Sequence, residues 1–136
     1  MGLLPATLMA NTTQPKDTGS IEITITGFKN SNGVAKVALV NSEENYDAKA
    51  PFEGYNFKIF DNKVVKIISN LPYGEYAIKV FHDENANDKL DKRIFGIPAE
   101  SYGFSNNVRA QFGPPAYQDA KFELNAPVIH LEIEVR

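Results

Sequence analysis

Hydrophobic and polar residues alternate with a period of two along most of the chain after residue 20. In the first such run, Ile21, Ile23 and Ile25 are separated by polar residues. This alternation is typical of a strand with one face in a core and the other in solvent. Six further strand-like runs cover residues 34–40, 55–59, 64–68, 76–80, 122–124 and 129–135. The pattern therefore predicts about seven strands and no amphipathic helix.

Turn-forming residues separate these runs. Residues 30–33, Asn-Ser-Asn-Gly, predict a hairpin between the first two strands, and Asp61-Asn62 and residues 71–74 predict two more turns. The polar stretch 41–51 is expected to be a loop. Short strands joined by turns favour an all-β fold, an antiparallel β-sandwich of immunoglobulin-like or prealbumin-like type. A closed barrel is the alternative, since periodicity alone does not separate the two.

The first 20 residues differ from the rest. Residues 3–10 are mildly apolar and residues 11–20 are polar, so we expect either the remnant of a signal peptide or a floppy terminal segment. Residues 21–136 are expected to form one β-sandwich domain. No apolar run approaches the roughly 18–20 residues that a transmembrane helix needs.

Composition and charge narrow the function classes. The 136 residues are 43% hydrophobic and 23% charged, which is ordinary for a globular domain. The formal net charge of -3, with lysines scattered among acids, disfavours nucleic-acid binding. There is no cysteine, which excludes disulfides, thiolate nucleophiles and cysteine-ligated zinc.

A long span without strand periodicity, residues 83–120, interrupts the pattern. Loops this long are uncommon in compact domains unless they are functional or pack as ordered structure. The span holds five aromatic residues together with proline and glycine, so we expect an ordered insert folded onto the sandwich. Four of these aromatic side chains are expected to be mostly buried: Phe95, Tyr102, Phe104 and Phe112.

Oxygen-bearing side chains occupy alternate positions at the start of this insert. Asp83, Asn85, Asn87 and Asp91, with the main-chain carbonyl of Lys89, form a plausible oxygen set for Ca²⁺. The alternative interpretation is a series of Asx-turns, in which Asp and Asn side chains cap their own backbone amides without a metal.

The same region holds the residues with other chemistry. His82 beside Asp83 suggests acid–base pairing, but neighbouring strand residues point to opposite faces, which favours a structural histidine. Arg93 and Arg109 are expected to anchor a carboxylate ligand or to pair with Glu100 or Asp119. The candidate ligand surface comprises His82, Arg93, Glu100, Tyr102, Phe104, Asn106 and Arg109. The GxSxG, HExxH, CxxC and phosphate-loop motifs are missing from the sequence.

The central part of the chain resembles a bacterial family, domain of unknown function 2141. The resemblance is carried by the run GEYAIKVFHDENAN at residues 74–87, followed by residues 95–98, 102–107 and 112–115. It implies a small exported bacterial protein, periplasmic or secreted, and it implies no particular activity.

The insert also resembles, more distantly, the calcium loops of surface-adhesin B-type repeats, with the pattern DxNxDGxxDxxExG. Asp83, Asn85, Asn87, Asp91 and Gly96 fit this pattern. Asp88 replaces the turn glycine and Ile94 replaces the bidentate glutamate. Loss of that glutamate removes two oxygens, so we expect weak affinity.

Together these observations predict an exported, non-enzymatic β-sandwich module, stabilised by Ca²⁺, whose aromatic insert binds a protein, glycan or small ligand. The alternative is a hydrolase-like enzyme centred on four residues: His82, Asp83, Glu100 and Tyr102. A purely structural accessory domain is a third interpretation.

Overall fold

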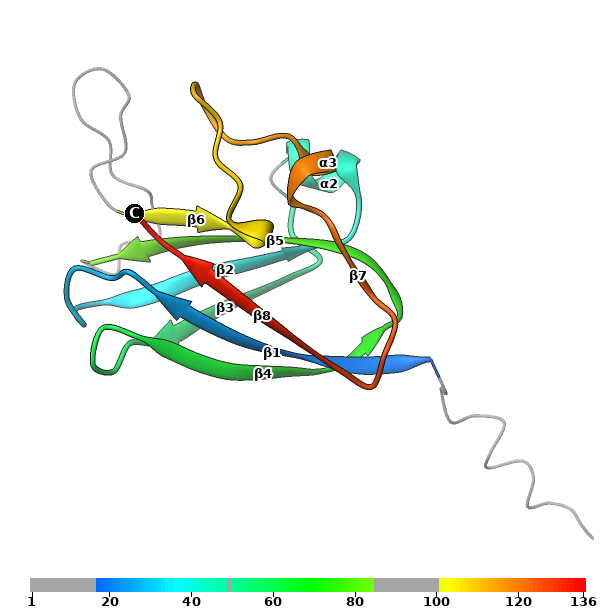
Figure 1. Cartoon of the computed structure of the whole chain (residues 1–136), viewed down its shortest axis with the longest axis horizontal. Helices are drawn as coiled ribbons and strands as arrows, with labels where there is room; N and C mark the ends of the chain where they lie inside the picture. The colour runs from blue at the N-terminus through cyan, green and yellow to red at the C-terminus, as the bar shows by residue number, and fades with distance from the viewer. Residues whose placement is uncertain (1–16, 49, 85–100) are drawn as a thin grey trace, which may run out of the picture.

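All seven predicted runs form strands in the computed structural model, which describes residues 17–48, 50–84 and 101–136. Two sheets pack face to face (Figure 1). The three-stranded sheet has the order β4-β1-β8, formed by Val64–Pro72, Thr18–Thr26 and Val128–Glu134. The other sheet has the order β3-β2-β5-β6, formed by Glu53–Lys58, Val34–Val40, Gly74–Asp83 and Tyr102–Phe104, and β7 (Phe122–Leu124) also pairs with β5. The predicted all-β sandwich is confirmed.

The sequence pattern missed four short elements among the described residues. Strand β6 and the 3-10 turn η1 (Ser105–Asn107) lie inside the insert, as does the helix α3 (Tyr117–Ala120). A second helix, α2 (Glu43–Ala48), lies in the stretch expected to be a loop. Elements of three to six residues are too short to show a reliable period.

The predicted hairpin at residues 30–33 is wrong. It joins β1 to β2, which belong to different sheets, so this connection crosses the sandwich. The sheets are also not purely antiparallel, because β8 runs parallel to β1, with Ile21 opposite Ile129 and Ile25 opposite Ile133. Alternation shows which face of a strand is buried, but it does not identify the neighbouring strand.

The main core lies between the sheets, as the alternation predicted. Ile21, Ile23 and Ile25 of β1 are fully buried against the inward residues of β5. On β8, Ile133 is buried and Ile129 and Leu131 pack against the same cluster. The apolar phase of each of these runs therefore faces one shared core.

A second hydrophobic cluster covers part of the outer face of the β3-β2-β5-β6 sheet. Tyr46 of α2 and Tyr117 of α3 pack edge to face, with ring centres 5.5 Å apart, and the Tyr46 hydroxyl donates to the Pro115 carbonyl. Figure 1 shows both helices above this sheet. The described part of the insert is thus a covering layer, as expected for an ordered insert.

The expected burial of the insert aromatics is only partly correct. Phe104 is buried in the outer cluster and Tyr102 is half-buried beside it. The expectation for Phe112 is wrong, since this side chain is 85% exposed. It precedes Gly113, whose positive φ of 69° turns the chain in open space. Phe95 lies outside the described residues.

The two sides of the sandwich are closed differently. On one side, Tyr102 of β6 exchanges two backbone hydrogen bonds of 3.0 Å with Arg136, just beyond β8. On the other side, β3 and β4 are connected by the turn at Asp61-Asn62, both residues having positive φ as the predicted turn requires. β3 and β4 are the terminal strands of their sheets there.

Replacing Phe104 with Ala is expected to lower the free energy of unfolding by about 3–5 kcal/mol, because the ring fills the outer cluster. Replacing the exposed Phe112 with Ala is expected to change it by less than about 0.5 kcal/mol. Urea unfolding followed by circular dichroism measures both. Equal effects of the two substitutions would contradict this description of the insert.

Candidate functional site

His82 is a buried histidine near the end of β5. Its side chain has no exposed surface, and its ring packs edge to face against Phe28 with centres 5.1 Å apart. The ring Nε2 lies 2.7 Å from the Asn32 carbonyl oxygen, whereas Nδ1 has no hydrogen-bond partner within the described part of the chain. His82 thus connects β5 to the crossing segment 27–33.

The beginning of the predicted calcium loop is held against the same segment. Asp83 is fully buried, and the Glu84 carboxylate accepts a hydrogen bond of 3.2 Å from the Asn30 side chain. Gly33 has a φ of 65°, and a Cβ at this position would lie only 1.9 Å from the Asp83 carbonyl oxygen. Only glycine permits so close an approach.

The remaining predicted calcium ligands, Asn85, Asn87, Lys89 and Asp91, lie outside the described residues. Within residues 17–48, 50–84 and 101–136, no three His, Asp or Glu side chains gather as a metal centre requires. The calcium site stays a prediction from sequence spacing.

The residues of the predicted ligand surface occupy different places. Arg93 and Glu100 lie outside the described residues. The guanidinium of Arg109 lies 5.2 Å from the ring centre of Tyr102 and donates to the Glu134 carbonyl. Asn106 donates to two carbonyls, those of Asp119 and Lys121, and so ties η1 to the end of α3.

Strand register brings together a group of outward-facing residues that the sequence did not identify. Gly54, Ala38 and Lys79 lie side by side across β3, β2 and β5. The next outward row across the same strands and β6 consists of Asn56, Lys36, Phe81 and Tyr102. These two rows form a continuous polar and aromatic surface beside the cluster that contains α2 and α3.

This surface is hollowed into a groove of about 450 Å³. The small side chains of Ala38 and Gly54 leave this space open, and Pro51 also lines it. Two cations, Lys36 and Lys79, and the ring of Phe81 line it. We use the name outer groove for this hollow, which is lined by Lys36, Val37, Ala38, Pro51, Gly54, Tyr55, Asn56, Lys79 and Phe81. Its volume falls within the range of about 300–1,000 Å³ that is usual for small-ligand sites.

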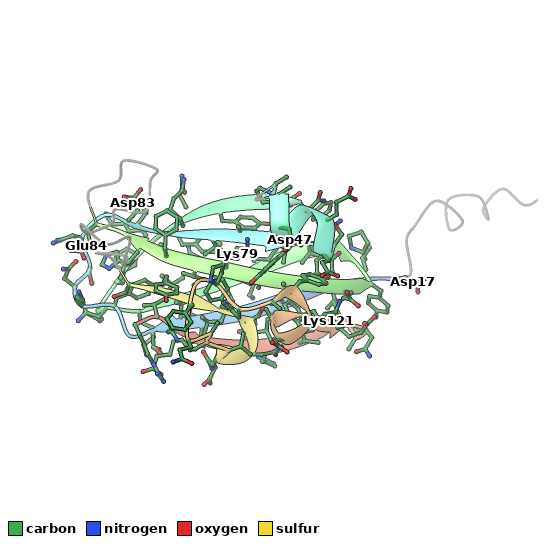
Figure 2. All side chains as sticks on the ribbon, turned by 90° about the horizontal axis from the view of Figure 1, so that it is seen from above. Asp17, Asp47, Lys79, Asp83, Glu84 and Lys121 are labelled. Carbon is green, nitrogen blue, oxygen red and sulfur yellow. The ribbon has the colours of Figure 1, made fainter. Side chains whose placement is uncertain are left out.

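The position of Lys79 in the outer groove is fixed by α2. Its ammonium donates a hydrogen bond of 2.8 Å to the Tyr46 carbonyl and lies 3.9 Å from the Tyr46 ring centre. Figure 2 shows Lys79 midway along β5, between α2 and the strand end that carries Asp83 and Glu84. In the sequence, the only sign of this groove is that Ala38 and Gly54 are small. The strand register is needed to show that these two residues are neighbours on the outward face.

Comparison with protein families identifies the chain. A family model described as "Uncharacterized protein conserved in bacteria (DUF2141)" matches residues 23–131. The chain belongs to this family. No curated protein and no solved structure matches it. The DUF2141 match begins within β1 and ends within β8, so it includes the outer groove. The family description states no activity.

In the described part of this DUF2141 chain, no helix has the length and apolar character needed to cross a membrane.

Tyrosine titration tests the packing beside the outer groove. Burial, with Asp47 and Asp119 nearby, raises the pKa of Tyr46 to about 12. Since the folded protein holds this proton more tightly than the unfolded chain, Tyr46 stabilises the fold fully below pH 10 and loses this contribution as the pH rises towards 12. The pKa of Tyr55 is also raised to about 12, so absorbance at alkaline pH is expected to show two tyrosines titrating near pH 12, and one fewer in Tyr46→Phe. A variant with an unchanged titration curve would contradict this assignment.

Proposed function

We propose that this DUF2141 protein is an exported, non-enzymatic binding module that takes a small carboxylate-bearing ligand in its outer groove. The observation that carries the proposal is the placement of two lysines and an aromatic ring around a floor of small residues. Such a concave surface with few, convergent polar groups is the usual form of a ligand site.

The charges of the outer groove favour an anion. Lys36 and Lys79 are both half-buried in it, although the chain as a whole carries a formal net charge of -3. The Asn56 amide provides further hydrogen-bonding capacity on the same row. Hydrogen bonds between ammonium and carboxylate groups are stronger than neutral ones, so a carboxylate gains most from this arrangement.

Phe81 gives the ligand an apolar boundary within the groove, and Tyr102 lies next to Phe81 just outside it. They are adjacent across β5 and β6, and both are half-buried. Arg109 lies over Tyr102 and extends the cationic surface beyond the groove. A ligand with a ring and a carboxylate, such as an acidic sugar or a small aromatic acid, matches both the aromatic and the cationic parts.

Export to the periplasm or the exterior is part of this proposal and rests on the family resemblance. The hydrolase-like alternative gains no support from the described residues. His82 and Asp83 are both fully buried, and the His82 Nε2 is engaged by the Asn32 carbonyl. Glu100 lies outside the described residues.

Calcium binding by residues 83–91 is a second candidate function. The observation that favours it is the firm anchoring of the loop base, where Asp83 is buried and Glu84 is held by Asn30. A fixed first ligand lowers the ordering cost of a cation site. The oxygen spacing in the sequence supplies the remaining support.

Titration of the ¹⁵N-labelled protein with glucuronate, galacturonate, benzoate and phenylacetate tests the outer groove. We expect at least one to bind saturably with a dissociation constant of about 1 mM, as suits ligands of this size. Amide shifts are expected in β2, β3 and β5 around the groove, and Lys36→Gln is expected to weaken binding about tenfold by removing a charged partner.

Gly54→Val supplies a sharper test of the same groove. A Cβ at Gly54 meets only the Val37 carbonyl, at 4.0 Å, so valine fits the strand while filling the groove. Gly54→Val is expected to abolish ligand binding without lowering the stability of the fold. The control variant Lys29→Gln, at an exposed lysine outside the groove, is expected to bind the ligand normally. Failure of all four compounds to bind, or binding unaffected by Gly54→Val, would refute the proposal.

Thermal melting tests the calcium candidate. With the expected dissociation constant of about 10⁻⁴–10⁻³ M, 10 mM Ca²⁺ should stabilise the fold by roughly 1.4–2.7 kcal/mol, which is several degrees of Tm. Mg²⁺ should stabilise it much less, because it is smaller and loses water reluctantly.

The control for the calcium test compares the Tm of each variant with and without Ca²⁺. A variant that is less stable without Ca²⁺ is therefore measured against its own baseline. Asp91→Asn is expected to reduce the shift caused by Ca²⁺, and Asp61→Asn, at an exposed turn, is expected to preserve it. An identical Tm of the native chain in EDTA, Ca²⁺ and Mg²⁺ would refute calcium binding. The Asx-turn interpretation of residues 83–91 would then remain.

A further inference from the structure

The two edges of the β4-β1-β8 sheet differ in whether their backbone groups are hydrogen-bonded to other parts of the described chain. At the β8 edge, Asn107 accepts from the Glu134 amide and donates to the Glu132 carbonyl, and Arg109 donates to the Glu134 carbonyl. Side chains thus occupy the hydrogen-bonding groups on this edge. At the opposite edge, β4 is the terminal strand among the described residues, and no further strand pairs with it (Figure 1).

The β4 edge has nine residues and is regular from Val64 to Ile68. In this part it pairs with β1 in antiparallel register from Ile21 opposite Ile68 to Ile25 opposite Val64, and the register shifts only beyond Ile68, where Asn70 has a positive φ. A terminal strand of this length presents a row of backbone donors and acceptors to which another strand can add. The described β4 contains none of the prolines that would interrupt such a row, except Pro72 at its end.

Apolar side chains are concentrated along this edge. Val65 and Ile67 of β4 are 57% and 61% exposed, and Phe60, in the turn before β4, is 66% exposed. The other apolar residues of β4, Val64, Ile68 and Leu71, are buried. Val65 and Ile67 lie on the outer face of the sheet, opposite Thr24 and Glu22 of β1. An exposed apolar patch on a sheet edge is typical of an interaction site.

Lysines surround this apolar patch. Lys66 lies between Val65 and Ile67 in sequence, at a position opposite the buried Ile23, and its ammonium is 5.9 Å from the Phe57 ring centre. Lys58 lies over Phe60 at 5.8 Å. A shallow hollow beside them is lined by Lys63 as well, with Asp61 as its acidic member. The local charge is therefore positive.

We propose that β4 accepts an extended segment of another protein as an added strand, and that this segment alternates apolar and acidic residues. Its apolar side chains pack beside Val65 and Ile67, and its carboxylates lie beside Lys66 on the other face. The interaction is independent of the outer groove, which lies on the other sheet.

The charges also explain why the occupant is not a second copy of the chain. Pairing of two β4 strands about an axis near Lys66 brings the lysines of both copies together. A charged residue at an inward position of an edge strand is a common protection against such self-association. An acidic partner converts the same lysines from a repulsive into an attractive element.

The test uses a nine-residue peptide of alternating valine and glutamate, a second with lysine in place of glutamate, and the ¹⁵N-labelled full chain. We expect the glutamate peptide to shift the amide signals of β4 and to slow their hydrogen exchange. It should bind at least about fivefold more tightly than the lysine peptide, because each cross-strand charge pair changes sign.

Charge reversal supplies the decisive comparison. Lys66→Glu is expected to invert the preference between the two peptides, and Lys63→Glu, at the neighbouring turn, is expected to reduce it. Lys29→Glu makes the same change of net charge at an exposed site outside this sheet edge and should preserve the preference. An unchanged preference in Lys66→Glu, or peptide-induced shifts confined to other strands, would overturn the proposal. A concentration-dependent dimer that Lys66→Glu alters would overturn the choice of partner.

Discussion

The buried hydroxyl of Ser105 joins three segments of the outer layer on which the candidate site depends. Its oxygen accepts a hydrogen bond from the Ile78 amide of β5 and donates to the Ala120 carbonyl at the end of α3. Since Ser105 directly follows β6, this one residue fixes the insert against the central strand. The outer cluster then packs Tyr117 against Tyr46, and Tyr46 in turn positions Lys79. The order of the outer groove therefore derives from a polar contact in an otherwise apolar layer.

Burial on both faces distinguishes β5 from the other strands. Its inward residues join the main core, and Ala77 and the neighbouring outward positions are covered by the helices or flank the groove. A strand held in this way is a rigid platform, which suits a binding surface because little conformational entropy is lost when a ligand arrives. The edge strands β3 and β4 lack this second layer, and there the chain exposes its lysines and aromatic residues.

The sequence predicted the strands well because alternation is a local property. Ile21 to Ile25, Tyr76 to Val80 and the run ending at Val135 each report their buried face directly. Strand neighbours are not local, so the parallel pairing of β8 with β1 and the crossing at residues 30–33 were missed. The outer groove was missed for the same reason: Gly54 and Ala38 become neighbours only through the register of β2 and β3. Of the predicted ligand surface, Tyr102 and Arg109 do lie together, with the guanidinium of Arg109 over the Tyr102 ring.

The parallel pairing of β1 with β8 also bears on when the domain can fold. β1 is the middle strand of its sheet, and one of its two neighbours is the last strand of the chain. Until β8 is available, one side of β1 has no partner and Ile21, Ile23 and Ile25 lack part of their enclosure. Contacts between segments so distant in sequence form late and slow folding. A chain of this design therefore completes its central core only after residues 128–134 have been synthesised.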